Sequence, residues 1–176
     1  MEVHVDNMLV KSKEEEDHLD DFKEMFNTLR QYSMKLNLSK CVFGVLSGKF
    51  LGFIVSQRGI EANPEKVRAI LEMSSPKTIK EVQSLMGKVA ALNRFVSKAT
   101  DKCLPFFKTL KHAFFWMGEC GAALQELKRY LNNPPLLSPS KEGEDLFLYL
   151  VVSTTAVSAA LINKENKIQL LVYYIN

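Results

Sequence analysis

The order of strand-like and helix-like segments is the feature that most constrains the fold. Apolar residues alternate with polar ones at the beginning and near the end of the chain, whereas the middle has the spacing of amphipathic helices. Strands and helices that are segregated in this way, without a regular βαβ repeat, are typical of the α+β class. The sequence therefore predicts an α+β fold, with linkers near residues 57–63 and 133–145.

The first part of the chain predicts a β-hairpin and then a helix. Short apolar segments on either side of Asp6-Asn7 predict the hairpin, with its turn at that pair. Ser12 and Glu15 have the spacing of a capping box, so a helix is expected to begin there. The residues expected on its apolar face are Leu19, Phe22, Met25, Phe26, Leu29 and Leu36.

A second hairpin is expected between residues 41 and 55. Ser47-Gly48 would form its turn, and residues 50–55 would form one continuous strand. Gly59 would then end the β-structure, because helical spacing begins soon after it.

Helix signals dominate the middle of the chain. Asn63-Pro64 is an N-cap followed by proline at the first helical position, and Thr78 with Glu81 forms a capping box. The helix after Thr78 is expected to bury Val82, Leu85, Met86, Val89, Leu92 and Val96. The remaining predicted elements are a helix after Pro105, a helix over residues 119–131 and strands over residues 146–152, 156–162 and 168–174.

Positive charge is concentrated in the middle of the chain. The formal net charge is +3, but residues 59–112 contain ten Lys and Arg against five Asp and Glu. A basic segment is suited to contact with a phosphate backbone, and an ordinary solvated surface is the alternative.

Three features of the sequence bear on its compartment. The longest apolar run, residues 146–152, is too short to cross a bilayer, and residues 1–10 lack the pattern of a secretion signal. Cys41, Cys103 and Cys120 lack metal-ligand spacing and are expected to be reduced thiols. These features predict an intracellular protein of the cytosol or nucleus, without a membrane partner.

Six local patterns occur in an order that one known family shares. The first three are His-Val-Asp-Asn-Met (residues 4–8), Lys-Leu-Asn-Leu-Ser-Lys-Cys-Val-Phe (35–43) and Phe-Leu-Gly-Phe-Ile-Val-Ser (50–56). The other three lie at residues 59–70, 76–87 and 115–128. Together they resemble the Tyr-x-Asp-Asp box, the primer-contacting strand, the thumb and the connection of the Pol polyprotein of gypsy-type LTR retrotransposons.

The resemblance implies four consecutive regions. These are the carboxyl-terminal part of a reverse-transcriptase palm (residues 1–58), a thumb-like helical segment (59–112), a connection (113–140) and the first strands of a truncated RNase H-like domain (141–176). It also implies a parent RNA-directed DNA polymerase with RNase H activity. The expected partners are a template–primer nucleic acid and a fingers–palm segment that is missing from this chain.

Polymerases of this family hold two Mg²⁺ ions with palm carboxylates. Asp6 occupies the first Asp position of the box, whereas Asn7 replaces the second and brings no charge. The family's other essential Asp lies on a strand upstream of this hairpin. The chain is therefore expected to be inactive as a polymerase and to bind no Mg²⁺ productively, and an Asx-turn role is the alternative for Asp6.

Further site residues follow from the same resemblance. Lys40 matches a lysine that is proposed to protonate the leaving pyrophosphate, and an exposed lysine beside a strand is the alternative. Phe50, Leu51, Gly52 and Phe53 would contact the primer, and they also fit the core of a strand. The thumb residues expected to reach phosphates, unless they only maintain solubility, are Lys77, Lys80, Lys88, Arg94 and Lys98.

The carboxyl-terminal strands lack the first metal ligand that the resemblance implies. Aligned on Ser153, Val151 stands where the family has the first Asp of its RNase H site, and Val cannot bind Mg²⁺. No RNase H activity is expected. Two alternatives remain open: a part of a complete polymerase that is active when joined to its fingers–palm segment, and a domesticated nucleic-acid-binding or interaction protein.

Overall fold

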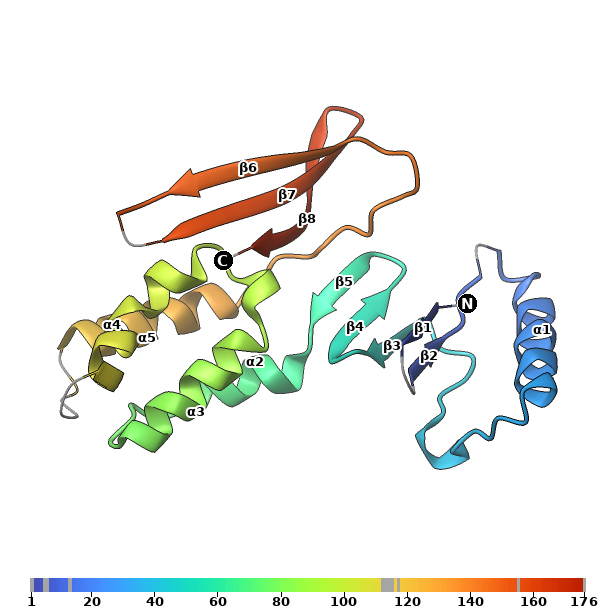
Figure 1. The fold of residues 1–176 in the computed structure, drawn as a ribbon, viewed down its shortest axis with the longest axis horizontal. Helices are drawn as coiled ribbons and strands as arrows, with labels where there is room; N and C mark the ends of the chain where they lie inside the picture. Colours follow the sequence, from blue (N-terminus) through green and yellow to red (C-terminus); the bar gives the residue numbers. More distant parts are fainter. Residues whose placement is uncertain are drawn as a thin grey trace. The chain divides into compact units, whose positions relative to one another are not determined.

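The chain forms two compact units, Met1–Val55 and Ser56–Asn176. The computed structural model describes residues 2–175 apart from positions 5, 6, 13, 112–115, 117 and 155. Both units combine helices with antiparallel strands (Figure 1), so the α+β prediction is confirmed.

The first unit opens with the predicted β-hairpin. β1 (Glu2–His4) and β2 (Asn7–Leu9) are antiparallel, and His4 pairs with Asn7. The hairpin is thus confirmed, but Asn7 begins the second strand and does not lie in the turn. Asp6, the other predicted turn residue, lies outside the described residues.

Helix α1 (His18–Gln31) begins later than the capping-box prediction, which is therefore wrong. Its N-cap residue is Asp17, whose side chain makes no capping hydrogen bond. The hydroxyl of Ser12 instead lies 2.8 Å from Nδ1 of His18 and donates to the carboxylate of Asp21. Ser12 therefore holds the preceding segment against the first turn of the helix from the side.

Only part of the predicted apolar face of α1 is buried. Met25 and Leu29, one turn apart, are buried, whereas Leu19 is exposed. At about 100° per residue, Leu19 points well away from the stripe that Met25 and Leu29 share. Leu36 lies outside the helix, which ends at Gln31.

A three-stranded sheet in the order β3-β4-β5 replaces the predicted second hairpin. Its strands are β3 (Ser47–Phe50), β4 (Phe53–Ser56) and β5 (Gly59–Ala62). The predicted turn at Ser47-Gly48 is wrong, because both residues lie in β3. The chain turns at Leu51-Gly52 instead, where both residues have positive φ, 50° and 80°. Positive φ at two central residues is the requirement of a type I′ hairpin turn.

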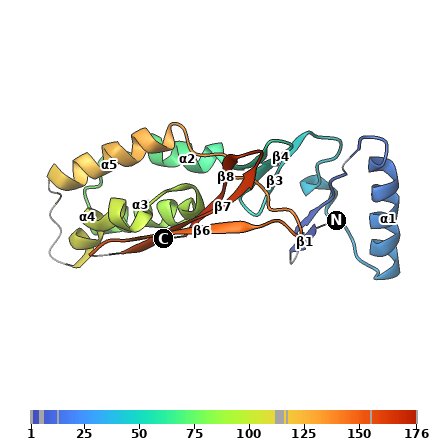
Figure 2. The same cartoon turned by 90° about the horizontal axis from the view of Figure 1, so that it is seen from above.

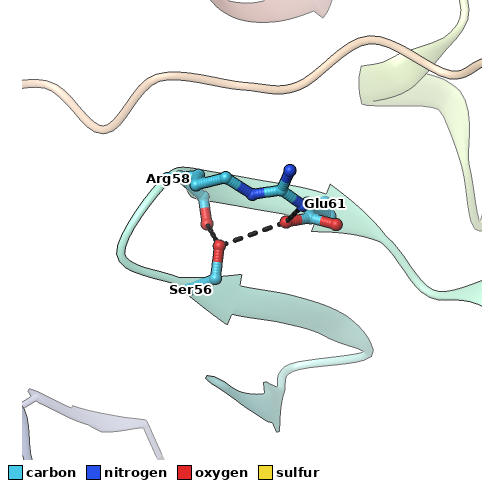
Figure 3. A network of polar contacts seen from close by, with 4 residues as sticks. Ser56, Arg58 and Glu61 are labelled. Atoms are coloured by element: carbon cyan, nitrogen blue, oxygen red, sulfur yellow. Dashed lines mark hydrogen bonds and ion pairs between the residues drawn. The ribbon is translucent and has the colours of Figure 1, made fainter. Parts of the chain in front are cut away.

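The prediction that Gly59 ends the β-structure is also wrong, because Gly59 begins β5. Figure 3 shows the polar contacts that close the turn between β4 and β5. The hydroxyl of Ser56 donates to the carbonyl oxygen of Gly59 at 3.3 Å and to Oε1 of Glu61 at 3.1 Å. Nη2 of Arg58 donates to the same Glu61 oxygen at 3.0 Å, so the ion pair also fixes the turn.

The second unit contains a block of helices with the predicted caps. Asn63 Oδ1 accepts from the backbone N–H of Glu65 at 2.9 Å, and Thr78 Oγ1 accepts from that of Glu81 at 3.3 Å. The helices are α2 (Pro64–Leu71), α3 (Ile79–Ala90), η2 (Asn93–Phe95), α4 (Ala99–Lys111) and α5 (Gly118–Leu131). Figure 2 shows α2 and α5 in one row and α3 and α4 in another.

Helix α4 departs from the prediction because it starts before Pro105 and contains it. A proline inside a helix costs about 3 kcal/mol, since it removes one hydrogen bond and crowds the preceding turn. Cys103 and Phe106, on either side of Pro105, are both buried. Their burial offsets the cost and keeps the helix continuous.

The core of the second unit comes mainly from the helices. Of the residues that α3 and its following segment were predicted to bury, all but the half-buried Met86 are buried, which confirms the periodicity. The largest fully buried side chains are Ile70, Val82, Leu85, Leu92, Phe95, Val96, Phe106, Cys120, Leu124, Leu127, Leu131 and Leu137.

The predicted three-stranded meander is confirmed. Its strands are β6 (Leu146–Val152), β7 (Val157–Glu165) and β8 (Ile168–Ile175), in the order β6-β7-β8 (Figure 1). Strand β7 extends to Glu165, three residues beyond the predicted end at residue 162. Asn163 is buried inside β7, where its side-chain N–H donates to Glu144.

The segment between α5 and β6 is anchored on two sides. Leu137 exchanges two backbone hydrogen bonds with Ile60 of β5, at 2.8 and 2.9 Å. The next residue, Ser138, donates its N–H to the carbonyl oxygen of Leu171 in β8 at 2.6 Å. One short stretch of connecting chain therefore bonds to both β5 and β8 of the second unit.

Candidate nucleic-acid interface

The first hairpin carries the residues that the sequence assigns to metal binding. Asn7 is exposed at the start of β2, and Asp6 lies outside the described residues. Among the residues that the structure describes, no three His, Cys, Asp or Glu side chains lie close enough together to hold a metal ion. One carboxylate beside one amide is too little negative charge for two divalent cations, so these residues alone do not fit a two-metal centre.

Lys40 lies on a short 3₁₀ turn, η1 (Leu38–Lys40). Asn37 caps this turn, because its Oδ1 accepts from the backbone N–H of Ser39 at 3.2 Å. Lys40 is exposed. The Asn37 cap therefore gives the loop that carries Lys40 a defined turn.

The turn between β3 and β4 presents the residues predicted to contact a primer. Phe50 ends β3 and Phe53 begins β4, and both are half-buried. Leu51 and Gly52 form the turn itself, and Leu51 is exposed. The two aromatic residues thus support the sheet, while the backbone at the tip of the turn is accessible to a ligand.

The five basic residues predicted for the thumb fall into two groups. Lys77, Lys80 and Lys98 are exposed. Lys88 and Arg94 make contacts within the protein: Nζ of Lys88 lies 3.4 Å from the carbonyl oxygen of Ala69, and the Arg94 guanidinium lies over the Tyr173 ring at 5.8 Å. Phosphate binding by either residue of the second group would compete with an internal contact.

A shallow groove between α2 and α3 was not foreseen from the sequence. It is lined by Glu65, Lys66, Ala69, Ser84, Gly87, Lys88 and Ala91. Ser84, Gly87 and Ala91 recur at intervals of three and four residues, which is the signal that could have revealed a stripe of small residues on α3. The groove has Lys66 and Lys88 in its lining, next to this small-residue stripe.

Gly87 stands out because nothing in the fold requires glycine there. It lies inside α3, and a β-carbon placed on it would meet no atom of the described chain within 4 Å. Glycine inside a helix costs about 0.5–1 kcal/mol relative to alanine. An exposed helical glycine without a packing reason is suited to close approach of a ligand to the backbone.

In the meander, Val151 lies in β6 opposite Ser158 of β7. Val151 is exposed, and so are its neighbours Leu150 and Val152.

None of the described helices has the length and apolar character needed to cross a membrane.

The fold and sequence agree with known reverse transcriptases. Residues 1–55 match the family model described as reverse transcriptase (RNA-dependent DNA polymerase). The Transposon Tf2-7 polyprotein of Schizosaccharomyces pombe is 28% identical over 165 residues, and the Tf2-3 polyprotein is 27% identical over the same length. These matches cover 93% of this chain but only 12% of each polyprotein.

Solved structures show the same fold. The foamy viral protease-reverse transcriptase in complex with an RNA/DNA hybrid matches 93% of this chain and 23% of its own chain, with a TM-score of 0.81 at 23% identity. The foamy viral protease-reverse transcriptase dRH in complex with double-stranded DNA matches 94% of this chain and 30% of its own, with a TM-score of 0.80 at 22% identity.

These similarities support the interpretation of the chain as a fragment of a reverse transcriptase. The similarity to the Tf2 polyproteins supports a fragment of the LTR-retrotransposon kind, and the chain spans about one eighth of the length of these relatives.

Proposed function

We propose that this chain supplies the part of a retrotransposon reverse transcriptase that holds the template–primer duplex, and that its contact surface consists of the α2–α3 groove and the exposed lysines Lys77, Lys80 and Lys98. The observation that carries the proposal is the exposed Gly87 in a groove that also contains Lys66 and Lys88. The related foamy viral enzymes were solved with double-stranded DNA and with an RNA/DNA hybrid, which supports a nucleic-acid ligand of duplex form.

The expected affinity follows from the number of available cations. Lys77 and Lys80, at the amino-terminal end of α3, and Lys98 are exposed. At a slope of about −0.9 per neutralised phosphate, two or three such contacts give a log–log salt dependence of roughly −2 to −3. Binding should be sequence-independent and no tighter than the ~10⁻⁴ to 10⁻⁶ M of non-specific complexes.

Fluorescence anisotropy with a labelled RNA–DNA duplex at several salt concentrations tests the proposal. We expect Lys77→Glu with Lys80→Glu to weaken binding and to reduce the salt slope by about 2. The matched control is Lys108→Glu with Lys167→Glu, which makes the same charge change at exposed lysines on α4 and after β7. Equal losses in both double variants would contradict a local contact surface.

Gly87→Ala separates close backbone contact from simple charge attraction. Alanine should stabilise α3 by about 0.5–1 kcal/mol, because the site has room for a β-carbon. If the duplex approaches the backbone at Gly87, the same change lowers affinity without altering the salt slope. A more stable variant with unchanged affinity would refute this contact.

We further propose that the 176-residue chain is by itself inactive as a polymerase and as an RNase H. The neutral Asn7 beside Asp6 and the apolar Val151 support this proposal. Primer extension on a primed RNA template, with Mg²⁺ or Mn²⁺, should not exceed the buffer blank. Extension that disappears in Asp6→Ala, or hybrid cleavage that disappears with EDTA, would overturn it.

The regional assignment is part of the same proposal. Residues 1–58 would belong to the palm, 59–112 to the thumb, 113–140 to the connection and 141–176 to an RNase H-like domain. In the polyprotein, a fingers–palm segment would supply the remaining carboxylate, and Lys40 and the turn at Leu51-Gly52 would then face the primer.

A further inference from the structure

Helix α5 carries two side chains that bond to segments far away in the sequence. Nζ of Lys128 donates to the carbonyl oxygen of Met73 at 2.6 Å, across 55 residues. The hydroxyl of Tyr130 donates to the carbonyl oxygen of Phe95 at 3.0 Å and accepts from the N–H of Ser97 at 3.3 Å. Met73 lies between α2 and α3, whereas Phe95 and Ser97 follow α3. The segments on both sides of α3 are therefore bonded to the last turn of α5.

The arrangement of the helices lets α5 reach both segments. α3 and α5 each pack against α2 and α4, so they lie diagonally across the helical block (Figure 2). Residues 128 and 130 are roughly 200° apart around the helix and point in nearly opposite directions. Lys128 reaches the end of α2, and Tyr130 lies on the α4 side, where the Lys102 ammonium is 5.3 Å from the centre of its ring. α5 thus holds α3 from both sides.

α5 is a firm base for these bonds because its apolar face lies in the core. Leu124, Leu127 and Leu131, spaced by three and four residues, are at most 1% exposed. Lys128 and Tyr130 are half-buried. A hydrogen bond from a charged donor is about twice as strong as a neutral one, and the Lys128 charge also suits the negative end of the α2 dipole.

α3 carries residues that the proposed function assigns to duplex contact. Lys77 and Lys80 lie at its amino-terminal end, and Gly87 lies inside it. Lys77 is tied to α3 itself, because its backbone N–H donates to Oε2 of Glu81 at 2.6 Å. A shift of the segment after α2 would therefore move Lys77 and the first turn of α3 together. Contacts that are held at a fixed spacing before binding lose less entropy when the duplex binds.

We propose that Lys128 and Tyr130 are positioning residues that hold α3 in the orientation in which it binds a nucleic-acid duplex. This role rests on the proposed function, because α3 carries contacts assigned there. Neither side chain touches the duplex, and each acts by keeping the binding-competent position of α3 populated. The dissociation constant rises as the inverse of that population, so loss of one anchor weakens binding by about threefold to tenfold if about a third to a tenth remains competent.

Tyr130→Phe removes one hydroxyl without changing the charge, so it tests positioning apart from electrostatic attraction. Fluorescence anisotropy with a labelled RNA–DNA duplex at low salt should show about threefold to tenfold weaker binding, with an unchanged log–log salt slope. The matched control is Tyr174→Phe in β8. It removes a hydroxyl that is hydrogen-bonded to Tyr130 but leaves the bonds to Phe95 and Ser97 in place, so it should bind like the natural chain.

Lys128→Met removes the bond to Met73, whereas Lys128→Arg keeps a cationic donor there. We expect the methionine variant to bind about threefold to tenfold more weakly with an unchanged salt slope, and the arginine variant to recover most of the affinity. A direct phosphate contact by Lys128 would instead reduce the slope by about 0.9. The matched control is Arg129→Met, which makes the same charge change at the next, exposed residue of α5 and should leave the affinity unchanged.

Hydrogen exchange of the natural chain covers the case in which these variants fold poorly. Coupling is reciprocal: if α5 stabilises the bound position of α3, the duplex stabilises the bonds to α5. The backbone N–H of Ser97 donates to Tyr130, so it should exchange more slowly when the duplex is added.

Four results would each overturn the positioning role of α5. They are unchanged affinity in Tyr130→Phe and Lys128→Met, a reduced salt slope in Lys128→Met, an equal loss in Arg129→Met, and no slowing of exchange at Ser97. If affinity still depends on Lys77 and Lys80, the proposed function stands and only the role of α5 fails. Absence of duplex binding by the natural chain at low salt would overturn both.

Discussion

Leu51 occupies a backbone position that few side chains tolerate. Its φ of 50° and the φ of 80° at Gly52 place both residues in the left-handed region. A bulky residue in that region costs roughly 1–2 kcal/mol, because its β-carbon crowds the backbone. The exposed Leu51 side chain has little burial to offset this cost.

We therefore expect Leu51→Asn to raise the free energy of unfolding of the first unit by about 0.5–1 kcal/mol, since Asn is favoured at the first central position of a type I′ turn. Gly52→Ala should lower it by about 1 kcal/mol for the opposite reason. Urea unfolding followed by circular dichroism measures both changes. Two variants that shift in the same direction would contradict the turn assignment.

Cys103 is a buried thiol inside the second unit. Burial raises its pKa from 9.0 to about 11, and the nearby Lys102 opposes part of that rise. The thiol therefore stays protonated in the folded protein over a range in which it ionises in the unfolded chain.

The raised pKa of Cys103 makes the protein less stable at high pH. Below pH 9 the thiol is protonated in both the folded and the unfolded state, so it does not make the free energy of unfolding depend on pH. Between pH 9 and about 11 only the unfolded state loses the proton, so the free energy of unfolding should fall by up to about 1.4 kcal/mol per pH unit. Denaturant titrations of the natural chain and of Cys103→Ala should diverge in this range, with Cys41→Ala as the control. Parallel curves would contradict the burial of the thiol.

Among the elements, β5 depends on a close backbone approach. Gly59 has a φ of 142°, and a β-carbon there would lie 2.3 Å from the carbonyl oxygen of Leu137. Gly59→Ala should therefore break the bridge between Ile60 and Leu137 and lower the free energy of unfolding of the second unit by about 2–3 kcal/mol. Thermal melts compared with those of Gly87→Ala, which has room for the added methyl group, measure the effect. A loss of less than about 0.5 kcal/mol would contradict the bridge.

Helices and strands whose ends depend on neighbouring residues were predicted correctly, whereas those whose ends depend on residues far along the chain were not. The caps at Asn63 and Thr78 involve neighbouring residues, so they were readable from the sequence. Strand β5 was missed because it pairs with Leu137, far along the chain, and Gly59 is needed there to let the two backbones approach each other. The turn at Leu51-Gly52 was missed because Leu rarely adopts positive φ.

For the molecule as a whole, the sequence was enough to predict the α+β fold class and the order of most helices and strands. It predicted the positions of the candidate site residues only in part. The motifs identified the family, and the charge pattern pointed to α3 and its surroundings. Charge counting could not show that Lys88 and Arg94 contact Ala69 and Tyr173, since those contacts depend on tertiary packing. The α2–α3 groove was missed because its signal is only the spacing of small residues on α3, and the groove itself depends on how α2 packs beside that helix.

The double anchoring of the connecting segment limits where the second unit can bend. Leu137 bonds to β5 and Ser138 bonds to β8, so no hinge can act between these adjacent residues without breaking backbone hydrogen bonds. Any rigid-body swing of the meander relative to β5 must therefore first release Ser138 from Leu171 or Leu137 from Ile60. A displacement of β5 would instead be transmitted directly to β8 of the meander, because only one peptide bond separates Leu137 from Ser138.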